Sequence, residues 1–84
     1  MDDEERLDAT VTRHRLELEE RELRAAMDLV EVDAAARVSL TGLRFGEQLL
    51  RRFRAEATRR GVRLEATWWP EDSGCDLLVQ RSGE

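Results

Sequence analysis

The stretch FGEQLLRRFRAEATRRG, residues 45–61, decides the fold. Its apolar residues recur at helical spacing and share one side of a 3.6-residue helix, while arginines crowd the other side. The apolar set is Phe45, Leu49, Leu50, Phe53 and Ala57. Positive charge at Arg59 and Arg60, followed by Gly61, is typical of a helix C-terminus with glycine at the C′ position. We therefore predict one amphipathic helix here.

Two alternating segments flank this helix. Residues 37–41 alternate and stop at Gly42, which predicts a first strand, and residues 62–69 alternate over a longer span. Residues 70–74, PEDSG, have the composition of a turn, and residues 75–81 then predict a returning strand. Pairing Trp69 with Gly74 aligns the apolar faces of this hairpin. The expected pairs are Trp68 with Cys75, Ala66 with Leu77, and Leu64 with Val79.

Residues 1–36 form an acidic, helix-prone arm without proline or glycine. One apolar stripe along it comprises Leu16, Leu23, Met27, Val30 and Ala34. A second, looser stripe comprises Leu7, Val11, His14, Leu18, Ala25, Leu29 and Val32. Residues 28–33 also alternate like a short strand, although the three alanines at 34–36 favour helix.

The fold class expected from these elements is α+β. The long N-terminal helix, residues 1–36, precedes a β-α-β-β core, residues 37–84, and the two together form one domain. Because a strand–helix–strand connection is normally parallel and right-handed, we expect a three-stranded mixed sheet that ends in a C-terminal β-hairpin.

Composition argues against catalysis. The 84 residues contain one cysteine, Cys75, and one histidine, His14, which the sequence places far apart. A disulfide framework, a multi-cysteine metal site and a catalytic pair would all require further partners. We expect no enzymatic activity, no cofactor and no metal. The acidic first residues lack the basic start of a secretory signal, and no long apolar run is present, so we expect a cytoplasmic protein without membrane contact.

Charge is distributed unevenly along the chain. Residues 44–63 carry seven arginines against two glutamates, a local charge of +5, whereas residues 1–36 carry twelve acidic residues against five arginines, a charge of −7. The basic helix suggests a small nucleic-acid-binding regulator as an alternative function. Its phosphate contacts would be Arg51, Arg52, Arg54, Arg59 and Arg60. The net charge of −5 favours instead the pairing of this helix with the acidic arm, within one chain or between copies.

The preferred hypothesis is a non-catalytic protein–protein interaction module that self-associates and acts as an adaptor, a regulator or a subunit of an assembly. A chain of this size buries a thin core, and such chains often gain stability from a partner. Alternation places Trp69 and Leu78 on the polar side of the hairpin, where either a partner or the N-terminal helix could cover them. The residues expected to contact a partner are Leu16, Leu23, Met27, Val30, Trp69 and Leu78.

Overall fold

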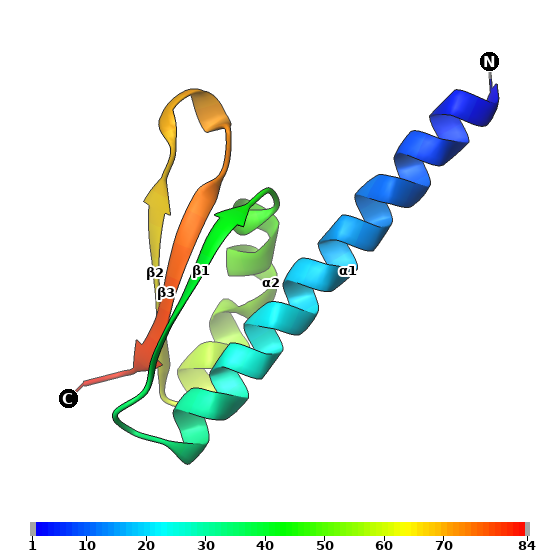
Figure 1. Cartoon of the computed structure of the whole chain (residues 1–84). Coiled ribbons are helices and arrows are strands. Elements are labelled where there is room, and N and C mark those ends of the chain that lie inside the picture. The colour runs from blue at the N-terminus through cyan, green and yellow to red at the C-terminus, as the bar shows by residue number, and fades with distance from the viewer. Residues whose placement is uncertain (1, 84) are drawn as a thin grey trace.

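The computed structural model describes the backbone of residues 2–83 and the side chains of residues 9–71 and 73–83. Figure 1 shows two helices beside a small sheet. The elements are α1 (Asp2–Val32), β1 (Arg37–Leu43), α2 (Gly46–Arg59), β2 (Val62–Trp68), a 3₁₀ turn (Pro70–Asp72) and β3 (Cys75–Arg81). This order confirms the α+β class. Residues 28–32, which also alternate like a strand, belong to α1.

The hairpin has the predicted register. Leu64 pairs with Val79, Ala66 with Leu77, and Trp68 with Cys75. The amide of Trp69 donates to the carbonyl oxygen of Gly74 at 2.9 Å, which closes the four-residue loop. Alternation of apolar residues was therefore sufficient to align these two strands, because a one-residue slip would turn every apolar side chain to the wrong face.

The expectation of a mixed sheet was wrong. The strand order is β1-β3-β2, and β3 is antiparallel to both neighbours. β1 and β2 do run in the same direction, but β3 lies between them, so no parallel pair forms. The physical reason is burial: Cys75, Leu77 and Val79 of β3 are all 0% exposed. The strand with the most deeply buried face takes the central position, where both helices can cover it.

Two glycines near the start of α2 have different structural roles. Gly42 has a φ of +69° and lies where the β1–β3 register shifts between Leu40 and Leu43. Its amide donates to Oδ1 of Asp76 at 3.1 Å. Gly46 is needed for close packing, because a Cβ there would lie 2.0 Å from Sγ of Cys75. The first glycine permits a bulge, and the second lets α2 begin directly on β3.

Both helices pack on the same face of the sheet, and one apolar core lies between the two layers (Figure 1). Its buried members are Leu23, Ala26, Met27, Val30, Leu43, Leu49, Phe53, Ala57, Val62, Cys75, Leu77 and Val79. The opposite face of the sheet has no helix over it. Leu78 points to this open face, paired with Ser39 on one side and Glu65 on the other. α1 therefore does not cover the face on which Leu78 lies.

α1 is longer than the sheet that it covers. From Leu16 onward its inner side enters the core, whereas the side chains of residues 9–15 are all exposed. Figure 1 shows the N-terminal part of α1 extending past the sheet and α2. This projection accounts for a molecule that measures 53 Å along its longest axis and only 25 and 19 Å along the others.

Glu19 ties α1 to the beginning of α2. Its side chain is 1% exposed, and its two carboxylate oxygens accept hydrogen bonds from the amides of Arg44 at 2.8 Å and Phe45 at 2.9 Å. Nε of Arg15 donates to the same carboxylate at 2.9 Å. No side chain of α2's own N-cap residue, Phe45, caps this helix. A carboxylate from another helix thus supplies the negative charge that a helix N-terminus favours.

We predict that Glu19→Ala lowers the free energy of unfolding by about 3 kcal/mol, because two amides lose a charged acceptor that water reaches poorly. Urea denaturation followed by circular dichroism measures the change. The matched control is Glu47→Ala, since Glu47 is an exposed acid in the first turn of α2. Its loss should cost about 0.5 kcal/mol or less. Equal losses in the two variants would show that Glu19 does not cap α2.

Candidate functional site

The inner apolar stripe of α1 is part of the core. Leu23, Met27 and Val30 are each 0% exposed, and Leu16 is half-buried at the edge of the same cluster. The side chains of Leu23, Met27 and Val30 therefore offer no surface to a partner in the folded chain, although the sequence pattern predicted partner contacts there. The reason is that α2 alone cannot cover a three-stranded sheet, so α1 packs on β3 and β1. Partner contacts must be sought elsewhere.

The outer stripe of α1 is the larger uncovered apolar surface. Val11 is 61% exposed, Leu18 37%, Leu29 51% and Val32 87%. His14 and Ala25, which belong to the same stripe, are exposed as well. The side chain of Leu7 lies outside the described residues. This stripe follows the side of α1 opposite the inner stripe, and its described members are exposed; Val11, near its N-terminal end, also lines a hollow with Arg44 and Phe45.

A second apolar surface lies at the hairpin end of the sheet. Trp68 is 54% exposed and Trp69 is 39% exposed. Trp68 keeps its predicted pairing with Cys75 but lies beyond the start of α2, and it forms one wall of a hollow of about 300 Å³ together with Leu43 and Arg44. The ring of Trp69 packs over the bare backbone of Gly42 and Gly74. Two half-exposed tryptophans thus occupy the same end of the sheet.

Trp69 and Leu78 do not form one patch. Four residues of extended strand separate Gly74, the partner of Trp69, from Leu78, a distance of roughly 13 Å. The intervening Asp76 holds the amide of Gly42. Leu78 is half-buried among polar neighbours on the open face. We therefore regard the hairpin end, where Trp68 and Trp69 project to opposite faces, as the candidate contact site on the sheet, rather than Trp69 with Leu78.

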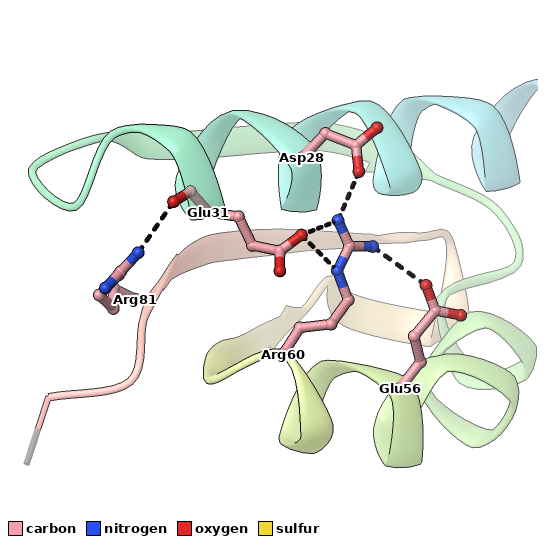
Figure 2. Close-up of polar contacts among 5 residues, drawn as sticks. All are labelled: Asp28, Glu31, Glu56, Arg60 and Arg81. Atoms are coloured by element: carbon pink, nitrogen blue, oxygen red, sulfur yellow. Dashed lines mark hydrogen bonds and ion pairs between the residues drawn. The ribbon is translucent and has the colours of Figure 1, made fainter.

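Part of the basic side of α2 contacts acidic residues of the same chain, as Figure 2 shows for Arg60. The guanidinium of Arg60 contacts Asp28 and Glu31 of α1, and its Nη1 donates to Glu56 at 3.0 Å. Nε of Arg60 donates to Glu31 at 2.7 Å. Hydrogen bonds with Glu31 and then Asp28 raise the pKa of Arg60 above its ordinary value. Arg81 extends the cluster by donating to the backbone oxygen of Glu31 at 2.9 Å.

The other arginines of α2 differ in the contacts that they make with carboxylates. Arg52 pairs with Glu20 of α1 at 2.5 Å, and its guanidinium lies 5.7 Å from the ring centre of Phe53. Arg51 faces Glu47 at 3.6 Å, with both side chains largely exposed. Arg54 and Arg59 are exposed, and among the described side chains no carboxylate lies within 4.0 Å of either. Of the five arginines expected to contact phosphate, two therefore bind α1 and three do not.

Cys75 and His14, the two residues considered for chemistry, lie in different surroundings. Burial raises the pKa of the Cys75 thiol, and the charges of Asp76 and Glu19 raise it further, so the thiol stays protonated near neutral pH. His14 is exposed on α1. In the loop before α2, the amides of residues 44 and 45 donate to the carboxylate of Glu19. Across the described part of the chain, no three metal-ligating side chains cluster.

Comparisons with known proteins add no family to this picture. No protein-family model, curated protein or solved structure matches the chain. Neither helix, over residues 2–83, combines the length and apolar character that crossing a bilayer requires. Any functional argument therefore depends on the surfaces that the fold leaves uncovered.

Removing the Arg60 side chain should lower the free energy of unfolding by about 2 kcal/mol, because Asp28, Glu31 and Glu56 would face one another without a shared cation. Arg59→Ala is the matched control: Arg59 is the preceding residue, it is exposed, and it should change stability by about 0.5 kcal/mol or less. Thermal and urea denaturation of both variants measure the difference. Indistinguishable stabilities would contradict a structural role for Arg60.

Proposed function

We propose that this protein is a non-catalytic protein–protein interaction module that self-associates and acts in the cytoplasm as an adaptor, a regulator or a subunit of an assembly. The observation that supports this function is the amount of large apolar surface that the chain does not cover. It lies in two places: the outer stripe of α1, and the pair Trp68 and Trp69 at the hairpin end.

The tryptophans suit partner binding for physical reasons. A tryptophan buries a large apolar area with few rotatable bonds, and this residue type is enriched among those that dominate binding energy at interfaces. Trp68 stands beside a hollow whose rim includes Arg44 and Glu47, so an apolar anchor has charged neighbours of both signs. A small apolar centre with a polar rim is the usual anatomy of a protein–protein interface.

Nucleic-acid binding remains the alternative, and the arrangement of arginines makes it less favourable. Arg52 and Arg60, two of the five expected phosphate contacts, already bind carboxylates of α1. Among the described side chains, Arg51, Arg54 and Arg59 make no ion pair with α1, and the whole protein carries a net charge of −5. The long-range field therefore repels a polyanion. Heparin retention that falls steeply with salt would favour this alternative.

The proposed function is tested with tryptophan fluorescence, because the only two tryptophans lie at the candidate contact site. Sedimentation equilibrium at rising concentration and capture of partners by the tagged protein identify associated species. If the hairpin end contacts a partner, emission should shift to shorter wavelength on binding, and Trp68→Ala with Trp69→Ala should weaken binding at least tenfold. Thr67→Ala, at a neighbouring exposed position, should leave binding unchanged.

A chain that stays monomeric at roughly 200 µM and captures no protein would contradict the proposed function, since that concentration detects even weak association. Binding that survives the loss of both tryptophans would leave the function in place but would move the contact site to another surface.

A further inference from the structure

The outer stripe of α1 has a regular spacing. Four of its members, Val11, Leu18, Ala25 and Val32, follow one another at intervals of seven residues. All four are exposed, on the side of α1 opposite the inner stripe. Apolar residues that recur every seven positions keep one side of a helix turned toward a partner helix. This regularity belongs to a surface that the monomer's own core does not use.

We infer that the outer stripe of α1 binds the same stripe of a second copy, with the two helices antiparallel. The inference rests on the proposed self-association and specifies the surface, the partner and the orientation. Since the stripe points away from the sheet, the two α1 helices meet in the middle and the two sheets lie on the outside. No rearrangement of the monomer is needed.

The projecting part of α1 gives an independent reason to expect a partner helix. Residues 9–15 have exposed side chains and extend beyond the sheet (Figure 1). Helical segments of about this length are marginal in water, since most helix stability in proteins comes from packing an amphipathic face. An antiparallel partner would place residues 24–30 of its own α1 against this projecting part. Each copy would then stabilise the exposed end of the other.

Charges beside the stripe determine the orientation. Arg15 and Glu22 flank it on one side, and Glu17 and Arg24 flank it on the other. Suppose that two such helices run antiparallel with Leu18 opposite Arg21 of the second copy. Each flank of one helix then faces the same flank of the other helix. Glu17 then meets Arg24 of the second copy, and Arg15 meets Glu22. The two-fold symmetry repeats both contacts, so the pair has four contacts between opposite charges near its centre. Both arginines also have contacts in their own chain, Arg15 with Glu19 and the backbone oxygen of Gly42 and Arg24 with the ring of Phe53, and both remain exposed.

A parallel pair would bring like charges together. In a parallel arrangement in register, Glu17 faces Glu22 of the second copy. Arg21 and Asp28, which lie beside the stripe at intermediate positions, would each face their own copy. Like charges at such positions are destabilising. The same residues that support an antiparallel pair therefore oppose a parallel one, and this contrast selects the orientation.

Charge reversal tests the inference by the sign of its effect. Glu17→Arg and Glu22→Arg should each weaken dimerisation at least fivefold, because each places two positive charges together in the antiparallel pair. In a parallel pair both substitutions would remove a Glu–Glu repulsion and strengthen dimerisation. Sedimentation equilibrium between roughly 1 and 200 µM spans modest affinities. Glu65→Arg, the same charge change at an exposed position on β2, is the matched control and should have no effect.

Cysteine cross-linking tests the register separately. In the antiparallel pair Val11 lies opposite Asp28 of the second copy, so an equimolar mixture of Val11→Cys and Asp28→Cys should form a disulfide-linked dimer. Val11→Cys alone should not cross-link, because its two copies would be roughly 25 Å apart along the helix. The native Cys75 is 0% exposed, so the unchanged protein is a silent control. Cross-linking of Val11→Cys with itself would contradict the inference.

The outcomes separate this inference from the proposed function. Leu18→Glu should abolish the dimer while circular dichroism shows an unchanged fold, because Leu18 makes no core contact in the monomer. A dimer that survives Leu18→Glu would overturn the inference and leave self-association in place. A monomeric protein that binds another protein through its tryptophans would also overturn the inference, whereas a monomer that binds nothing would overturn both.

Discussion

The packing of α1 on the sheet is the interaction on which the rest of the structure depends. A sheet of three seven-residue strands has one face with alternating apolar residues, and α2 lies mainly over β2, with a smaller contact to β3. Leu23, Met27 and Val30 of α1 fill the remainder, over β3 and β1. This choice decides which side of α1 faces solvent, and so which apolar residues remain for a partner.

The same packing brings the acidic and basic halves of the chain together. Glu20 pairs with Arg52, and Asp28 and Glu31 pair with Arg60, so three ion pairs join α1 to α2 and its C-cap residue. Surface ion pairs contribute little individually, but Arg60 is only 18% exposed and binds three carboxylates at once. Carboxylates of α1 therefore neutralise part of the +5 charge of the α2 region in the folded chain. This neutralisation is why a protein partner is a better hypothesis than a nucleic acid.

Local patterns predicted much of this fold, and the failures came from non-local packing. Period-two alternation was enough to predict the register of the hairpin. The 3.6-residue period of residues 45–61 was enough to predict α2. The place of β1 depended on which strand is most buried, which no local pattern reveals. Both stripes of α1 are periodic, so periodicity could not select the inner one. The sequence did contain a signal for the inner stripe, namely Glu19 and Glu20, which lie between Leu16 and Leu23. These two acids are buried, and buried acids need partners within the fold. The exposure of Trp68 depends on where α2 begins.

Amide hydrogen exchange at several protein concentrations tests the central claim most directly, namely that α1 uses its inner side for the fold and its outer side for a second copy. The account predicts that protection of residues 9–15 rises with concentration, because the side chains of that part of α1 are exposed in the monomer. Protection of residues 23–30 should be high and constant, since these residues belong to the core of each copy. Concentration-dependent protection of residues 23–30, or constant protection along the whole helix, would contradict it.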